Sequence, residues 1–359
     1  CEGGSTNESY WNATVVVKGS NFIAEDIIFE NSFNQYISAK EADDVLINEK
    51  GDNPSATKVE NGLIRPKTLY STEGQDKKYV ERSAAIAIIG DRAVLNHCAV
   101  VGRQDSFYGH VKVRVACYKC ELYGATDYIF GSQDMIVYDS KLVMNTSDDK
   151  NDQAYLIALK APSYKGSLFM NCTVTSTTPG INTASKYKSK PGNFGRPWET
   201  TENATFANTT IETSNHPDYE GASLILKNAW NSSLSGQSEF SYEYGNNYNG
   251  AVRCEGGNYN SKFLTDAEAA NITLFTYTKG TDNWDPFRDM FEINSDLTAL
   301  DNAIEIVTGI ESLAADKEVA GVEYYSVGGQ KIQTPKRGIS IKVTRYNDGS
   351  YTTSKVLVK

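Results

Sequence analysis

The 359-residue sequence is short of the residues and motifs on which many hydrolases depend. It contains only three histidines, at positions 97, 110 and 216. It has no Gly-x-Ser-x-Gly nucleophile elbow and no His/Glu zinc motif. These absences disfavour the usual serine-hydrolase and zinc-hydrolase chemistries.

The sequence also lacks an excess of positive charge and a long apolar run. Its formal net charge is −10, which argues against nucleic acid as a partner. An acidic polymer would have to meet positive charge locally. No run of 18 or more apolar residues occurs, so no membrane-spanning helix is predicted.

Cysteines are few, and their spacing does not favour a metal site. Six are present, and Cys117 and Cys120 form a Cys-x-x-Cys pair. Because an odd separation on a strand points two side chains to opposite faces, a shared metal is not expected there. Cys98 and Cys120 are predicted to stack as small core residues. A disulfide between them stays open, so the cysteines do not settle the redox compartment.

A short pattern recurs along the chain: an apolar residue, often Asn, a small residue, then another apolar residue. Copies are FENSF (29–33), LNHCAV (95–100), YKCEL (118–122), YDSKL (138–142), FMNCTV (169–174) and FANTTI (206–211). Each copy is short, alternating and rich in strand-forming residues. Spacings of 22 and 20 residues, longer where loops intervene, indicate stacked coils of a parallel β-helix.

Two aspartates follow the same period and supply candidate chemistry. Asp105 and Asp127 are 22 positions apart, as are Cys98 and Cys120. Neighbouring strands lie about 4.8 Å apart, so the two carboxylates are expected side by side on one face. Two carboxylates that close cannot both ionise easily, which suits one nucleophile and one general acid/base.

Three motifs resemble one known family. They are GRQDSFY (102–108), GATDYIFG (124–131) and GRPW (195–198). Together and in this order they resemble the motifs of the pectin methylesterases, carbohydrate esterases whose fold is a right-handed parallel β-helix of the pectin lyase type. The resemblance implies an all-β fold and covers roughly four fifths of the chain. It implies no metal and no organic cofactor.

The resemblance also assigns roles to four residues. Asp127 would be the nucleophile that forms a covalent acyl intermediate, and Asp105 the general acid/base. Arg196 would pair with Asp127 and keep it ionised. Gln104 would donate its amide to the developing oxyanion. Because Gln104 and Asp105 would point to opposite sides of an ideal strand, the chain must bend here.

Other residues are expected to meet the substrate. Tyr108, Phe130 and Trp198 lie beside the catalytic motifs and would form a platform for sugar rings. Arg103 and Arg114 are candidates to bind galacturonate carboxylates. Arg82 stands where the family has a second Gln. It could donate to the oxyanion, bind a substrate carboxylate or mark an altered substrate.

The chain divides into a main domain and a tail. Residues 1–286 are predicted to form the esterase β-helix, with N-terminal coils missing from the numbered chain. Residues 34–81 are a polar excursion, read as a surface loop or alternatively as a lid. Residues 287–316 form a connector with a helix expected over 297–307. Residues 317–359 are predicted to be a small β module carrying a charge of +5.

These observations predict a monomeric, secreted, cell-surface or periplasmic enzyme that acts on methyl-esterified pectin or oligogalacturonide. The tail resembles sorting or attachment modules of Bacteroidota, which would imply a bacterial source, although a plain accessory role fits it equally. Rival hypotheses are an esterase or thioesterase of the same fold, and an inactive glycan-binding β-helix. A pectate lyase is disfavoured, because Asp148 and Asp149 are too small an acidic cluster for its calcium.

Overall fold

The structure is a computed structural model that describes residues 13–31, 46–47, 65–66, 84–146, 152–178, 186–301, 319–326, 329–334, 338–347 and 351–358. The chain divides into two compact units, residues 1–291 with 295–304 and residues 292–294 with 305–359. Within the described ranges, no helix combines the length and the apolar character needed to cross a membrane.

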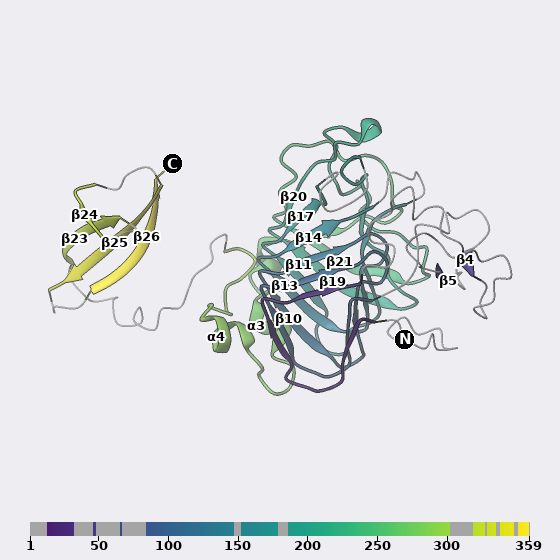
Figure 1. The fold of residues 1–359 in the computed structure, drawn as a ribbon, viewed down its shortest axis with the longest axis horizontal. Helices are drawn as coiled ribbons and strands as arrows, with labels where there is room; N and C mark the ends of the chain where they lie inside the picture. Colours follow the sequence, from purple (N-terminus) through teal and green to yellow (C-terminus); the bar gives the residue numbers. More distant parts are fainter. Residues whose placement is uncertain are drawn as a thin grey trace. The chain divides into compact units, whose positions relative to one another are not determined.

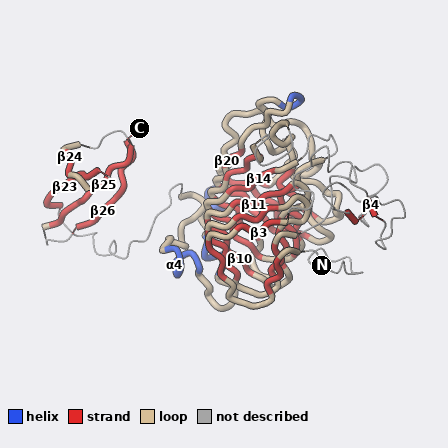
Figure 2. The backbone as a smooth tube through the Cα atoms, viewed as in Figure 1, coloured by secondary structure: helices blue, strands red, loops and turns tan. Residues whose placement is uncertain are grey.

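The first unit is a parallel β-helix built from three stacked sheets (Figures 1 and 2). Sheet A contains β1 (Val15–Val17), β6 (Ile86–Ile88), β9 (Phe107–Gly109), β12 (Ile129–Gly131), β15 (Tyr155–Leu159) and β18 (Asn193–Gly195). Sheet B contains β2 (Ile23–Glu25), β7 (Ala93–Asn96), β10 (Arg114–Tyr118), β13 (Asp134–Tyr138), β16 (Ser167–Met170), β19 (Thr201–Ala207), β21 (Gln237–Tyr244) and β22 (Lys262–Phe263). Sheet C contains β3 (Ile28–Glu30), β8 (Ala99–Val101), β11 (Glu121–Gly124), β14 (Lys141–Met144), β17 (Thr173–Ser176) and β20 (Thr210–Ile211). The all-β fold predicted from the repeat is therefore confirmed.

Five of the six copies of the repeated pattern lie at the turn between sheets B and C, whereas FENSF (29–33) begins on β3 of sheet C. In six coils a single residue with positive φ follows the sheet B strand, and a small or apolar residue then leads into sheet C. The positive-φ residues are Asp26, His97, Lys119, Asp139, Asn171 and Asn208. Asn and Asp tolerate this left-handed conformation better than most residues, which suits the two Asn and two Asp residues at this position.

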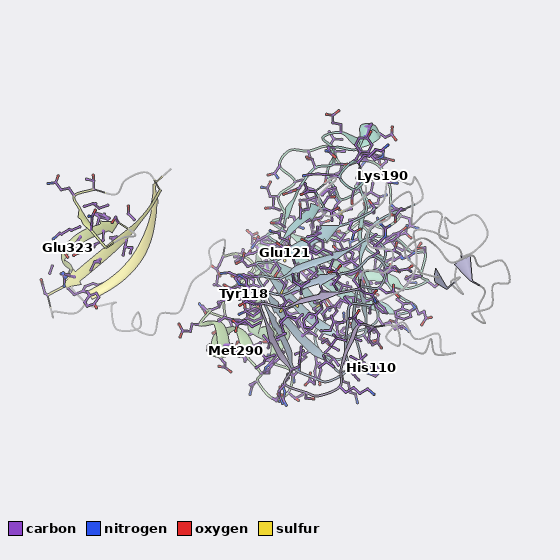
Figure 3. All side chains as sticks on the ribbon, viewed as in Figure 1. His110, Tyr118, Glu121, Lys190, Met290 and Glu323 are labelled. Atoms are coloured by element: carbon purple, nitrogen blue, oxygen red, sulfur yellow. The ribbon has the colours of Figure 1, made fainter. Side chains whose placement is uncertain are left out.

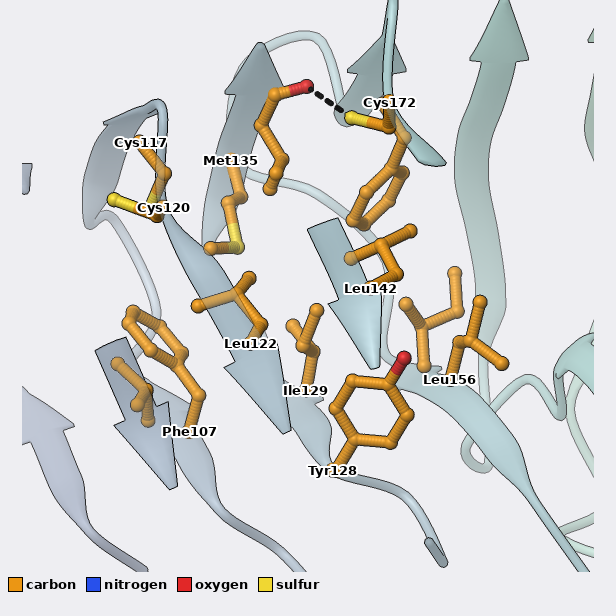
Figure 4. Packing of buried hydrophobic residues seen from close by; sticks show 14 of the residues in the cluster. Phe107, Cys117, Cys120, Leu122, Tyr128, Ile129, Met135, Leu142, Leu156 and Cys172 are labelled. Atoms are coloured by element: carbon orange, nitrogen blue, oxygen red, sulfur yellow. Dashed lines mark hydrogen bonds between the residues drawn. The ribbon is translucent and has the colours of Figure 1, made fainter. Parts of the chain in front are cut away.

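The core fills the interior of the coils (Figure 4). Cys98, Cys120 and Cys172 are buried there as free thiols, as expected for small core residues. The prediction that Cys117 and Cys120 face opposite sides was wrong, because both pack in this cluster. The strand ends at the positive-φ residue Lys119, which turns the chain and directs both side chains inward.

Short helices cover the outer face of sheet B. They are α2 (Asp266–Ala269), α3 (Leu274–Thr278) and α4 (Pro286–Phe291), and η2 (Pro217–Tyr219) lies elsewhere in the unit. The ring of Phe287 packs at 5.7 Å from that of Tyr138, and the Tyr277 hydroxyl is 3.2 Å from that of Thr205. Sheet A carries no such cover from these helices, and Tyr108 and Phe130 lie on its outer face.

The structure describes parts of two further predicted segments, residues 297–307 and residues 34–81. The helix expected over residues 297–307 is not present in residues 297–301. There Thr298 forms a β-bridge with Thr273, and its amide donates to the Asp301 carboxylate at 2.8 Å. The rest of that segment lies outside the described residues. Of the excursion at 34–81, only the paired strands β4 (Leu46–Ile47) and β5 (Arg65–Pro66) are described.

The second unit contains a four-stranded antiparallel sheet in the order β24-β23-β25-β26. Its strands are β23 (Val319–Ser326), β24 (Lys331–Ile332), β25 (Gly338–Tyr346) and β26 (Tyr351–Val358). Glu323, labelled in Figure 3, forms ion pairs with Lys331 and Arg345 on the neighbouring strands. Strands predicted for the tail are therefore confirmed.

Candidate active site

Asp105 and Asp127 occupy equivalent positions in adjacent coils. Each lies in the turn that leads from sheet C into sheet A, two residues before its strand, and β9 pairs with β12 so that Phe107 faces Ile129. Both aspartates have positive φ, 59° and 51°. The Asp105 amide donates to the Thr126 carbonyl at 3.1 Å. The bend required beside Gln104 is thus present, and the carboxyl groups belong to neighbouring turns of one column.

Arg196 reaches Asp127 from a later coil. It follows β18 directly, and its Nε and Nη2 donate to the two Asp127 carboxylate oxygens at 2.7 and 2.6 Å. Burial alone would lower the pKa of the guanidinium, but the charge and hydrogen bonds of Asp127 outweigh it and raise that pKa. The charge of Asp105 acts in the same direction. Asp127 is therefore held by a bidentate, charge-assisted pair.

The pair is close to solvent without being freely exposed. Asp105 and Asp127 are only 4% and 6% exposed, and the Arg196 side chain is 16% exposed. The Nη1 of Arg196 donates to the hydroxyl of Ser233 at 3.1 Å. Little water reaches these charges, so their mutual attraction is screened less than on an open surface.

Tyr155 supports the same guanidinium and was not anticipated from the sequence. Its ring centroid lies 4.2 Å from the Arg196 guanidinium carbon, a cation–π contact. Burial raises the pKa of the Tyr155 hydroxyl; the Arg196 charge opposes this rise and the Asp127 charge adds to it. Register counting could have found it, because Ile157 faces Ile129 and Tyr155 therefore shares the column of Asp127.

The three aromatic residues predicted to form a sugar platform lie together on the outer face of sheet A. Tyr108 faces Phe130 across β9 and β12, with ring centroids 5.0 Å apart. Phe130 lies 6.2 Å from Trp198, and the ammonium of Lys160 stands 4.1 Å over the Trp198 ring. The three aromatic residues thus form one continuous strip that runs across the coils.

Gln104 and Arg82 were predicted to act on the oxyanion or on the substrate. Gln104 is half-buried and adjoins Asp105 in the turn. Arg82 lies outside the described residues, as do Asp148 and Asp149. The roles of Gln104 and Arg82 stay predictions.

Arg103 and Arg114 do not fit the predicted role in binding carboxylates. Both are 3% exposed, and each already has an acidic partner within the fold. Arg103 pairs with Asp152. Arg114 lies 2.6 Å from both Asp91 and Asp282. These arginines hold segments of the β-helix together, because burying an arginine requires a partner for its charge.

The arrangement offers carboxyl chemistry. Within the part of the chain that the structure describes, no group of three or more His, Cys, Asp or Glu side chains is placed to hold a metal ion. The site brings together a paired carboxylate, a second carboxyl one coil away and an aromatic strip. Such a set can supply a nucleophile, a proton donor and a surface for a ring-shaped substrate.

Comparisons with known proteins agree with this reading. The sequence model of the family described as Pectinesterase matches residues 55–281, more than half of the chain. A probable pectinesterase/pectinesterase inhibitor 64 of Arabidopsis thaliana is 26% identical over 199 residues, covering 53% of this chain and 31% of the relative. A pectinesterase of Petunia integrifolia is 23% identical over 284 residues, covering 77% and 61%. The chain therefore spans less than two thirds of the length of these relatives.

A solved structure shares the fold. A pectin methylesterase crystallised with a hexasaccharide superposes with a TM-score of 0.51 at 20% identity, covering 80% of this chain and 77% of the other. At 20% identity, this similarity supports the parallel β-helix fold and nothing beyond the fold.

Proposed function

Because the chain belongs to the pectinesterase family, we propose that it hydrolyses methyl esters of galacturonate units in pectin. The products would be methanol and a free carboxylate on the polymer. The observation that carries the proposal is the bidentate Arg196–Asp127 pair, with Asp105 one coil away. The adjoining aromatic strip gives the sugar chain a surface to lie on.

The geometry supports a two-step reaction. An Asp127 carboxylate oxygen attacks the ester carbonyl carbon, and the amide of Gln104 donates to the developing oxyanion. The carbon–methoxy bond then breaks, and Asp105 gives its proton to the departing oxygen to form methanol. Asp105 next takes a proton from water, whose oxygen attacks the acyl carbon and releases Asp127. Arg196 keeps the Asp127 carboxylate oriented through both steps.

Methanol release from methylated pectin tests the proposal. We expect release by the unaltered protein and at least about a thousandfold slower release by Asp127→Asn, because an amide cannot serve as the nucleophile. Asp139→Asn is the matched control, since Asp139 also has a positive φ in a coil turn but lies between sheets B and C. It should release methanol at the normal rate.

Other outcomes would favour the rival hypotheses. Equal release by Asp127→Asn and the unaltered protein would refute the nucleophile. Hydrolysis of simple aryl or thiol esters without release from pectin would indicate an esterase of different specificity. Binding of oligogalacturonide without any release would indicate a glycan-binding β-helix.

The proposed substrate also bears on location and partners. We propose that the protein acts outside the cell, because pectin is a cell-wall polymer. We also propose that it acts as a monomer. The small sheet β23–β26 would serve for sorting, attachment or as an accessory domain. The predicted Bacteroidota origin is not supported by the curated relatives above, which come from plants.

A further inference from the structure

We propose that Tyr155 is a positioning residue that holds both members of the Asp127–Arg196 pair in register. The inference rests on the proposed function for its kinetic consequence, but its structural basis is independent of the substrate. Tyr155 is the one residue in the described structure whose backbone binds the turn that carries Asp127 and whose ring supports Arg196.

The backbone of Tyr155 brackets Asp127. Its amide donates to the Ala125 carbonyl at 2.9 Å, and its carbonyl accepts from the Tyr128 amide at 3.4 Å. The Thr126 hydroxyl donates to the carbonyl of Gln153 at 3.4 Å. Residues 153–155 therefore hold the Asp127 turn on both sides, which fixes the position of the Asp127 backbone and thus of its side chain.

The side chain of Tyr155 contacts Arg196, the partner of Asp127. The Arg196 guanidinium meets three different groups: Asp127 along one edge, Ser233 at Nη1, and the Tyr155 ring against its face. A planar cation held by its edge alone can still rotate about that edge. The Tyr155 ring, whose centroid is 4.2 Å from the guanidinium carbon, opposes this rotation, because a guanidinium that turns away loses its cation–π contact.

The ring is itself anchored. The Tyr155 hydroxyl donates to Gln153 Oε1 at 3.1 Å, and Gln153 Nε2 donates to Asn193 Oδ1 at 3.3 Å. Asn193 is fully buried and donates to the Asn228 carbonyl at 3.2 Å. Because Asn193 begins β18, the strand that Arg196 follows, this chain of hydrogen bonds closes a loop between the ring and the backbone beneath the arginine.

A graded substitution series tests this role. Tyr155→Phe keeps the ring and loses only the hydroxyl, so we expect kcat to fall less than about threefold. Tyr155→Leu removes the aromatic face, and kcat should fall about tenfold with KM within about twofold, because the lost interaction acts on the reacting carboxylate. A merely structural role would lower the amount of folded protein without changing kcat per folded molecule.

A tyrosine elsewhere supplies the control. Tyr164 lies 5.1 Å from the guanidinium carbon of Arg114, a cation–π contact on sheet B. Tyr164→Leu removes the same kind of contact and should leave kcat unchanged. A fall in kcat equal to that of Tyr155→Leu would overturn the proposal.

A second measurement does not depend on activity. In nitrogen-15 NMR, the Nε–H signal of Arg196, assigned by its loss in Arg196→Lys, should be sharp and slow to exchange with water in the unaltered protein and in Tyr155→Phe. It should broaden or vanish in Tyr155→Leu. If this pattern appears while no protein releases methanol, the proposed function fails and the positioning role stands. If methanol is released but the signal and kcat survive Tyr155→Leu, the positioning role fails.

Discussion

Glu202 is expected to make the protein less stable as pH rises, and the effect can be calculated from its surroundings. This residue lies on β19, two and four positions before Ala204 and Phe206, which pack in the core. It is fully buried, and one carboxyl oxygen accepts a hydrogen bond from Ser241 at 2.9 Å. Its other oxygen has no hydrogen-bond partner among the described residues. Burial raises the pKa of Glu202 to about 8, against the smaller opposing effect of the Ser241 hydroxyl.

The sign follows from proton binding. An unfolded glutamate releases its proton near pH 4.3, whereas folded Glu202 keeps it to about pH 8. Below the lower value both states are protonated, so the stability is fully present there. Between the two values the folded state binds more protons, and the free energy of unfolding falls by about 1.4 kcal/mol per pH unit. The total loss is about 5 kcal/mol by pH 8, and it stays constant above that.

The substitution Glu202→Gln isolates this contribution. Glutamine keeps the shape and the acceptor for Ser241 but does not titrate. Urea unfolding at pH 4.5, 6 and 8 should show the variant near the unaltered protein at the lowest pH and several kcal/mol more stable at the highest. Parallel curves of stability against pH for the two proteins would falsify the reasoning.

A second glutamate provides a control of opposite sign. Burial acts to raise the pKa of Glu121, but its hydrogen bonds with Lys141 and Tyr123 prevail and lower it. Its contribution is therefore present above the unfolded pKa and is lost as pH falls through the folded one. Glu121→Gln should alter the curve only in the acid range.

Two further predictions concern the substrate and the scaffold. Trp198→Ala should raise KM for methylated oligogalacturonide about tenfold with a smaller change in kcat, because it removes a half-buried ring of the aromatic strip. An unchanged KM in steady-state methanol assays would place the sugar elsewhere. Arg114→Met should lower the free energy of unfolding by roughly 2–3 kcal/mol, because the half-exposed Asp91 and Asp282 lose their hydrogen bonds with a buried guanidinium, while kcat per folded molecule stays constant. Urea unfolding that shows a loss under 1 kcal/mol would contradict this.

The period of the sequence predicted the column of aspartates, since side chains one coil apart must share a face. The GRPW motif supplied the arginine, and the structure places it on Asp127. The orientation of Cys117 and Cys120 could not be predicted in the same way. Strand alternation holds only while the strand continues, and a lysine gives little sign that it takes positive φ.

The partners of the buried arginines were beyond sequence reasoning for another reason. Arg103 meets Asp152, which is 49 positions away, and Arg114 meets Asp282, which is 168 positions away. These pairs join coils to loops whose lengths vary, so no period connects them. An arginine near a catalytic motif looks like a substrate ligand until a partner within the fold is seen.

Tyr155 could not be predicted from the sequence period, because the residues aligned in successive coils are unequally spaced along the chain. Asp105 and Asp127 are 22 positions apart, but a loop lengthens the next coil to 28 positions before the column reaches Tyr155. The coil after that contributes Asn193, which faces Tyr155 directly. Four consecutive coils thus place two acids, an aromatic ring and an amide in one line. An insertion lengthens the loop between two strands and leaves the pairing of those strands intact. Side chains of successive coils therefore stay aligned even where their separation in the sequence no longer shows the period.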